Sequence, residues 1–194
     1  EGVSPQIPDD LQKEFKVINL INGYRSRGHL FTKTNPVRDR RTYLPTLSIE
    51  NFGLDKDDLD NVFNAGEIIG LGPQPLSVII AHLEEIYCDS IGVEYMYIRK
   101  PEIISWIQNK LNINNNQPKF SLAQKKKLMS KLIEAVSFEN FLHTKYVGQK
   151  RFSLEGGESL IPALDILIEE AANKGVKEFV MGMAHRGRLS TLVN

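Results

Sequence analysis

The chain has 194 residues, and its 24 lysines and arginines balance its 24 aspartates and glutamates. A net charge of zero gives no overall field that would attract nucleic acid or a membrane surface, so neither is an expected partner. The apolar runs also fall well short of the ~20 residues that a membrane span needs. A single cysteine, Cys88, excludes intrachain disulfides, and four scattered histidines lack zinc-ligand spacing, so no metal site is expected in this chain.

Helical periodicity dominates the N-terminal part of the chain. Residues 1–10 are polar and interrupted by prolines, which predicts an extended arm. Beyond the arm, apolar residues recur three and four positions apart, as they do on the buried face of a helix. Helices are expected at residues 11–27, 76–91 and 102–111, shorter helical pieces at 48–52 and 57–65, and an extended segment or strand at 93–98.

The clearest linker is NINNNQP at residues 112–118, which has little to bury and is expected to separate helical layers. Serine residues at helix starts accept hydrogen bonds from exposed backbone N–H groups. Ser121 and Ser137 are each positioned to cap a helix, over residues 122–137 and 138–146 respectively.

The last stretch of the chain adds an expected strand to the helical pattern. Residues 159–172 carry an apolar stripe of helical period and end at a basic residue followed by glycine. Residues 176–183 contain consecutive apolar side chains and are expected to form a buried strand. A further helix starts near Arg188 and has no cap before Asn194. Because a single strand is not a finished sheet, we expect the chain to be the N-terminal part of a longer protein.

Three side chains that suit anion binding lie between this expected strand and the last helix: His185, Arg186 and Arg188. In open α/β folds, ligands bind where the carboxyl ends of strands meet the following helices. A helix N-terminus at that position favours phosphate or carboxylate, and the arginines add permanent positive charge. The pattern therefore indicates an anion site. The alternative is that the arginines pair with carboxylates across a domain contact and that His185 is a structural histidine.

Four strings resemble the E1 component of the 2-oxoglutarate dehydrogenase complex, in that family's order and at its spacing. They are LINGYRSRGHL at 20–30, GVEYMYI at 92–98, KRFSLEGGESLIP at 150–162 and GMAHRGRL at 182–189. HRGRL after an expected strand, together with RFSLEG earlier in the chain, makes a specific signature. The resemblance extends from about Asp10 to the end of the chain. It concerns only the first part of the family's much longer polypeptide.

The resemblance implies a mostly α fold: a helical N-terminal domain over residues 11–147, followed over 148–194 by the first helix and strand of a thiamine-diphosphate-binding α/β domain, truncated here. The family uses thiamine diphosphate and Mg²⁺ to decarboxylate 2-oxoglutarate oxidatively in the tricarboxylic acid cycle. It passes the succinyl group to the lipoyl group of its E2 partner, a dihydrolipoyl succinyltransferase. The full-length protein is expected to be a homodimer, cytoplasmic in a bacterium or in the mitochondrial matrix of a eukaryote.

The resemblance also implies roles for individual residues. His185 matches the family's active-site histidine, which contacts the substrate and the reaction intermediates. Arg186 matches the arginine associated with the diphosphate cofactor, and Phe152 matches a residue that lines the substrate pocket. Possible neighbours of the site are Arg151, Glu155 and Arg188.

Parts of the family's pattern are absent from this sequence. Neither the Gly-Asp-Gly…Asn motif that binds Mg²⁺ and diphosphate nor the carboxylate that activates the cofactor is found in these 194 residues. The fragment alone is therefore expected to be inactive and to hold no thiamine diphosphate. Ser190-Thr191 replaces the family's usual Asn-Val after HRGRL, a change expected to alter packing rather than chemistry. Two alternatives stay open: a paralogous E1 acting on 2-oxoadipate or another 2-oxo acid, and a non-catalytic module for assembly or E2 docking.

Overall fold

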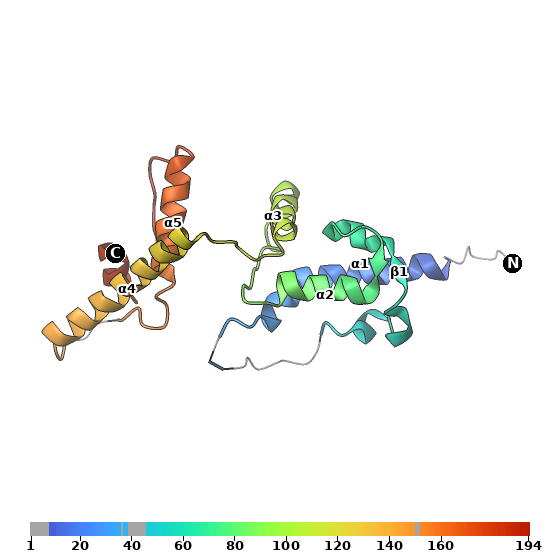
Figure 1. The fold of residues 1–194 in the computed structure, drawn as a ribbon, viewed down its shortest axis with the longest axis horizontal. Coiled ribbons are helices and arrows are strands. Elements are labelled where there is room, and N and C mark those ends of the chain that lie inside the picture. The colour runs from blue at the N-terminus through green and yellow to red at the C-terminus, as the bar shows by residue number, and fades with distance from the viewer. Residues whose placement is uncertain (1–7, 36, 39–45, 150–151) are drawn as a thin grey trace. The chain divides into compact units, whose positions relative to one another are not determined.

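The computed structural model describes residues 8–35, 37–38, 46–149 and 152–194. Within these residues the chain is mostly helical and has one two-stranded sheet, so the predicted fold class is confirmed. The chain divides into two compact units, Glu1–Pro118 and Lys119–Asn194 (Figure 1). This division follows the asparagine-rich linker and precedes the expected boundary at 147/148, because helix α4 (Leu122–Lys145) packs against α5 (Leu160–Asn173).

Two packed helices, α1 (Asp9–Arg27) and α2 (Leu76–Tyr87), form the centre of the first unit. Helix α1 starts slightly earlier than predicted, directly after Pro8, with acidic residues in its first turn and basic residues in its last turn. Both sets of charges suit the helix dipole. The expected arm otherwise lies outside the described residues. Helix α2 ends before the predicted residue 91, because the chain turns at Cys88.

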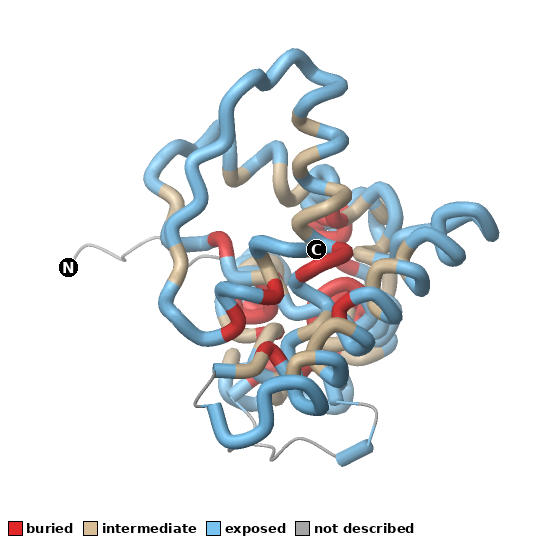
Figure 2. The backbone as a smooth tube through the Cα atoms, turned by 90° about the vertical axis from the view of Figure 1, so that its left-hand side faces the viewer, coloured by how far each residue is buried: buried red, intermediate tan, exposed pale blue. Residues whose placement is uncertain are grey.

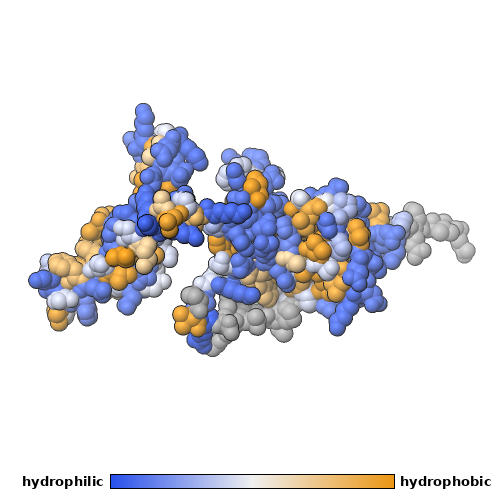
Figure 3. All heavy atoms as spheres, in the orientation of Figure 1, coloured by the Kyte–Doolittle hydropathy of each residue, from blue (hydrophilic) through white to orange (hydrophobic). Residues whose placement is uncertain are grey.

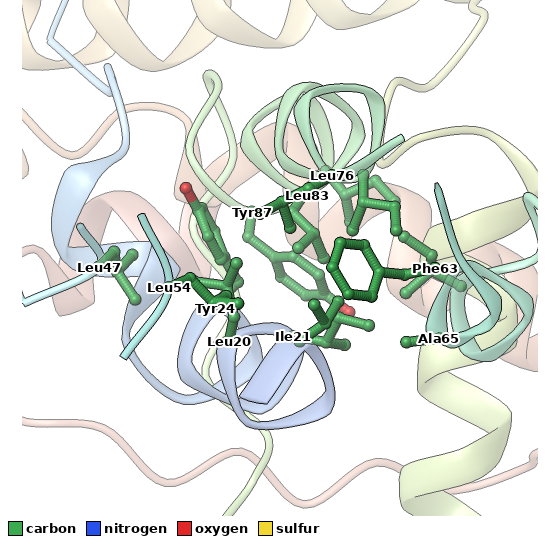
Figure 4. Close-up of a cluster of buried hydrophobic side chains, with 14 of the residues drawn as sticks. Leu20, Ile21, Tyr24, Leu47, Leu54, Phe63, Ala65, Leu76, Leu83 and Tyr87 are labelled. Atoms are coloured by element: carbon green, nitrogen blue, oxygen red, sulfur yellow. The ribbon is translucent and has the colours of Figure 1, made fainter. Parts of the chain in front are cut away.

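The core of the first unit is made by residues from α1, α2 and the segments between and after them. Figure 4 shows side chains of α1 pointing toward those of α2. Each fully buried leucine or isoleucine contributes roughly 1.5–3 kcal/mol relative to an exposed one. The buried hydrophobic residues are Val17, Leu20, Ile21, Tyr24, Leu47, Leu54, Phe63, Ala65, Ile69, Leu76, Ile79, Leu83, Ile86, Tyr87, Tyr95 and Leu111.

Short 3₁₀ helices and a small hairpin join α1 to α2. The 3₁₀ helices are η1 (Gly28–Phe31), η2 (Ile49–Phe52), η3 (Lys56–Asp58) and η4 (Asn64–Ile69). Strand β1 (Val62–Phe63) pairs antiparallel with β2 (Gln74–Pro75), with Phe63 opposite Gln74. The predicted helical piece at 57–65 is therefore not continuous: its first residues lie in η3 and its last two in η4, with β1 between them. Phe63 is buried while Val62 is exposed, which is the alternation of a strand and not of a helix.

A partly buried ion pair fastens this connecting region to α1. The Lys13 Nζ atom lies 2.6 Å from the Asp58 Oδ1 atom, and the Asp58 side chain is almost fully buried. Asp55 and Asp58 also form a capping box around η3. The carboxylate of Asp58 is thus satisfied by charged and backbone donors at once, as a buried charge requires.

Helix α3 (Pro101–Ile113) closes the first unit and is much less buried than α1 or α2. Proline at its first position suits the fixed φ of that residue. The side chain of Trp106, the only tryptophan in the sequence, is 61% exposed. The Lys110 Nζ atom lies 5.7 Å from the centre of its ring. The preceding segment at 93–98 is irregular and forms no strand.

The second unit is built on α4, which is one continuous helix and not two. Its start is capped as predicted by Ser121, whose hydroxyl accepts the Gln124 N–H while the Gln124 side chain reaches back. The predicted second cap at Ser137 is wrong. No proline or glycine interrupts the helix there, and a serine alone is tolerated inside a helix. Lys127 joins α4 to α5, with its Nζ atom 3.1 Å from Asp165 and also paired with Glu169.

Helix α5 ends as predicted at a left-handed glycine, Gly175, with φ of 89°. The predicted strand at 176–183 is wrong, because the segment is extended but has no hydrogen-bonded partner strand among the described residues. The apolar side chains of Val176, Phe179, Val180 and Met181 are exposed. The backbone coloured by burial in Figure 2 shows that exposed stretches make up much of the described chain. The chain ends in a short helix, α6 (Arg188–Val193). None of the helices in the described part of the chain is both long and apolar enough to cross a membrane.

Candidate functional site

Two loops of the second unit meet at a single glycine. The Gly187 N–H donates a hydrogen bond of 2.8 Å to the Phe152 carbonyl. Gly187 has a φ of 71°, which side chains disfavour. A Cβ atom at this position would also lie only 2.6 Å from the Leu154 Cδ1 atom. Glycine is therefore required here both for the backbone conformation and for the close approach of the two loops.

This contact brings together three of the residues that the sequence singled out. The ring centres of Phe152 and His185 are 4.4 Å apart, and the two rings are tilted by 52°. The guanidinium carbon of Arg186 lies 5.6 Å from the centre of the Phe152 ring, within range of a cation–π interaction. Arg186 Nη1 also donates a 3.4 Å hydrogen bond to the carbonyl of Ser153. All three side chains are exposed, so the cluster is open to a ligand.

Glu155 and Arg188, two of the three residues expected to neighbour the site, are not part of this cluster. Glu155 lines a hollow of about 220 Å³ together with residues of α4, and its N–H donates to the Ser153 hydroxyl. Arg188 is the first residue of α6, and its N–H donates to the His185 carbonyl at 3.3 Å. Arg151 lies outside the described residues. The structure thus brings Glu155 and Arg188 near the cluster without a direct side-chain contact to it among the interactions described.

The loop that carries Phe152 also contacts helices α4 and α5 through Leu154. The Leu154 N–H donates a 3.2 Å hydrogen bond to Glu139 Oε1 on α4. The Leu154 side chain is buried with Ala135 of α4 and Ile161 of α5. Sequence reasoning missed this anchor, because a glutamate and an alanine on a long helix carry no local signal of such a role. The glycine of HRGR and the leucine of RFSLEG were visible only as parts of a motif.

The start of α6 gives little support to an anion site made by a helix N-terminus. The helix has six residues, and the N–H groups of Gly187, which precedes it, and of Arg188, its first residue, already donate to protein carbonyls. The expected strand before it does not form. The role of Arg186 in binding an anion therefore stays a prediction.

The residues present fit part of a thiamine diphosphate site. Arg186 offers a planar fork of donors, which suits diphosphate oxygens, and Phe152 and His185 provide an aromatic wall beside it. Among the described residues, no group of three or more His, Cys, Asp or Glu side chains is arranged to hold a metal ion. The described part of the chain therefore offers no set of ligands for the Mg²⁺ ion that accompanies the cofactor.

A larger hollow of about 590 Å³ lies in the first unit and contains none of the predicted site residues. Tyr24, Glu84 and Cys88 line it, among others. Burial, reinforced by the charge of Glu84, raises the pKa of the Cys88 thiol to about 12 and raises the pKa of Tyr24 as well. A thiol in such surroundings stays protonated and is a poor nucleophile.

Comparison with known proteins shows which proteins this chain is similar to. No family model matches the chain. It is 43% identical over 191 residues to the "Multifunctional 2-oxoglutarate metabolism enzyme" of Mycolicibacterium vanbaalenii, covering 96% of this chain and 15% of the relative. The chain is thus similar to an enzyme of 2-oxoglutarate metabolism.

Two further relatives are components of 2-oxoglutarate dehydrogenase. The chain is 45% identical over 185 residues to the 2-oxoglutarate dehydrogenase E1 component of Cupriavidus necator, covering 94% of this chain and 20% of the relative. It is 43% identical over 189 residues to the E1/E2 component of Corynebacterium glutamicum, covering 95% and 15% respectively. The resemblance seen in the sequence is therefore confirmed: the chain is homologous to part of the 2-oxoglutarate dehydrogenase E1 components and spans 15–20% of their length.

Proposed function

We propose that this chain is part of an E1 subunit that oxidatively decarboxylates 2-oxoglutarate with thiamine diphosphate and transfers the succinyl group to the lipoyl group of E2. The observation that carries the proposal is the contact between Phe152, His185 and Arg186. The names of the relatives, which refer to 2-oxoglutarate, support 2-oxoglutarate as the substrate. Because the chain spans 15–20% of those relatives, the activity belongs to the longer polypeptide.

His185 is proposed to contact the substrate and the reaction intermediates. An imidazole can donate a hydrogen bond to a developing negative charge and later deliver a proton near neutral pH. The ring of Phe152 packs against it at 4.4 Å, which limits the orientations of the imidazole and supplies an apolar wall.

Arg186 is proposed to bind the cofactor diphosphate. A guanidinium presents paired donors in a rigid plane, and stacking over Phe152 holds that plane in place. Thiamine diphosphate, when bound, supplies the electron sink for decarboxylation. The Mg²⁺ ligands and the remaining cofactor contacts are assigned to the longer polypeptide.

The partners and the location are proposed from the same family relationship. They are 2-oxoglutarate, an E2 dihydrolipoyl succinyltransferase, a second copy of the full-length polypeptide, and the cytoplasm of a bacterium. Exposed apolar side chains on α4, α5 and α6 provide surface that a larger assembly can bury (Figure 3).

The decisive test is His185→Ala in the full-length polypeptide. We expect turnover of 2-oxoglutarate to fall by about 10²-fold or more, because proton transfer by a positioned group contributes on that scale. The melting temperature should stay nearly constant, since His185 is exposed. His143→Ala, an exposed histidine on α4, is the matched control and should retain activity.

Unchanged turnover in the His185 variant would contradict the catalytic assignment and favour an assembly or E2-docking module. Measuring 2-oxoadipate beside 2-oxoglutarate tests the substrate, and a higher kcat/KM for 2-oxoadipate would point to the paralogous E1. Calorimetric titration with thiamine diphosphate and Mg²⁺ tests the cofactor. Binding is expected for the full-length protein and not for the 194-residue chain.

A further inference from the structure

Helix α4 contacts the candidate site through one carboxylate. Glu139 Oε1 accepts the partly buried Leu154 N–H at 3.2 Å, across an interval of fifteen residues. Leu154 follows Phe152 by two positions, so this hydrogen bond fixes the backbone just beyond the residue that stacks on His185. A carboxylate is a stronger acceptor for a backbone N–H than a neutral group.

The same short loop is held on its other side by the turn that carries His185. Gly187 donates to the Phe152 carbonyl at 2.8 Å and lies in close contact with Leu154. Leu154 is thus fixed on three sides: by Glu139, by Gly187 and by the buried cluster with Ala135 and Ile161. Movement of Leu154 away from α4 would shift Phe152 relative to His185.

We propose that Glu139 is a positioning residue for the Phe152–His185 pair and acts on it through the Leu154 backbone. This inference rests on the proposed function, because it assumes that the pair takes part in the reaction. It goes beyond the resemblance because it gives a role at the site to a residue of α4, a helix that none of the sequence motifs includes. Misplacement of reacting groups by about 1 Å can cost up to about 10²-fold in rate, so a single tether of this kind can have a measurable effect.

The test uses Glu139→Ala and Glu139→Gln in the full-length polypeptide. We expect Glu139→Ala to lower kcat for 2-oxoglutarate by about ten-fold through misplacement of Phe152. Glu139→Gln keeps an oxygen that can accept the Leu154 N–H and should restore most of the loss. Glu134→Ala is the matched control: it removes an exposed carboxylate of α4 whose described partners, Ser130 and Lys131, lie on the same helix.

Hydrogen exchange provides a readout that does not depend on activity. In Glu139→Ala, the Leu154 amide should exchange faster, while amides in the middle of α5 should stay as protected as in the unchanged protein. A variant that simply unfolds would lose protection in both segments. In that case Glu139→Gln decides the matter: restored folding with kcat at the Ala-like reduced level would overturn the proposal.

The proposed function and the positioning role of Glu139 can be disproved separately. If His185→Ala abolishes turnover while Glu139→Ala has normal kcat and normal exchange at Leu154, the positioning role is wrong and the proposed function stands. If His185→Ala leaves turnover unchanged, the proposed function fails first. Faster exchange at Leu154 with unchanged kcat would also overturn the positioning role.

Discussion

The two units of this chain bury their apolar residues to very different extents. Among the described residues, the first unit has a core of sixteen buried hydrophobic side chains, whereas the core of the second has three. The second unit instead exposes apolar side chains along its helices and its extended segment. Leu122, Met129, Ile133, Phe141, Leu167, Phe179, Val180, Leu189 and Leu192 are all exposed there.

This difference separates the source of stability from the location of the candidate site. The first unit contains a core that can support independent folding, since burial of apolar surface is the main favourable term. The second unit contains the Phe152–His185–Arg186 cluster and holds it by a few hydrogen bonds and one small cluster. Its stability is therefore expected to depend strongly on what covers its apolar surface.

The largest expected effect is a cavity in the first unit. Ile79→Ala removes a fully buried side chain of α2 and should lower the free energy of unfolding of that unit by about 2–5 kcal/mol. Leu192→Ala, which changes an exposed side chain of α6, should change the stability of this chain by about 0.5 kcal/mol or less. Urea unfolding followed by circular dichroism measures both. Equal losses would remove the contrast between the units.

An intermediate effect is expected for Asp58→Ala, which leaves Lys13 without its buried partner. We expect a loss of about 1–2 kcal/mol near neutral pH, because the variant loses the capping box of η3 and the hydrogen bond from Lys13, whose partly exposed ammonium can be hydrated instead. Asp60→Ala, an exposed aspartate two positions later, is the control.

The same carboxylate predicts acid sensitivity of the first unit. Burial by itself would raise the pKa of Asp58, but hydrogen bonds from Lys13, the Asp55 backbone and Asn61 outweigh it and lower that pKa below the usual value of an aspartate. A lowered pKa stabilises the fold fully above the unfolded value and loses that contribution as pH falls through the folded value. Chemical unfolding at a series of pH values should therefore show stability falling below about pH 4, less steeply in Asp58→Ala. Parallel pH profiles would contradict the assignment.

The smallest expected effect concerns the cap of α4. Ser121→Ala removes the capping box with Gln124 and should destabilise the second unit by about 1 kcal/mol. Ser130→Ala, in the exposed interior of the same helix, should leave stability unchanged or slightly raised, because alanine favours helix. A thermal melt followed by circular dichroism compares the two. Equal melting temperatures would show that the cap does not limit the stability of this unit.

Local sequence signals predicted most helices well, because periodicity and caps act over a few residues. Ser121 and Gly175 mark real helix ends. Ser137 did not, since a serine also fits inside a helix when its neighbours continue the turn. The β1–β2 hairpin was missed because two-residue strands carry almost no pattern, and its pairing joins Phe63 to Gln74 across an intervening 3₁₀ helix.

Local sequence signals predicted the structure around the candidate site poorly. Periodicity predicted a strand at 176–183, but a strand needs a partner, and none of the described segments supplies one. The meeting of Phe152 with His185 was expected only from the family resemblance, because no local pattern links two loops so far apart. The Glu139 contact was not expected at all, since nothing in a helical sequence marks which glutamate accepts a bond from a distant loop.

The position of Trp106 has a practical consequence for fluorescence measurements on this chain. It is the only tryptophan of the sequence, it belongs to α3 of the first unit, and it is mostly exposed beside Lys110. Intrinsic tryptophan emission therefore reports on the first unit alone, and the change in its spectrum on denaturation should be small. Conformational changes around Phe152 and His185 are not expected to alter tryptophan emission. A fluorophore introduced into α4, α5 or α6 would be needed to observe them.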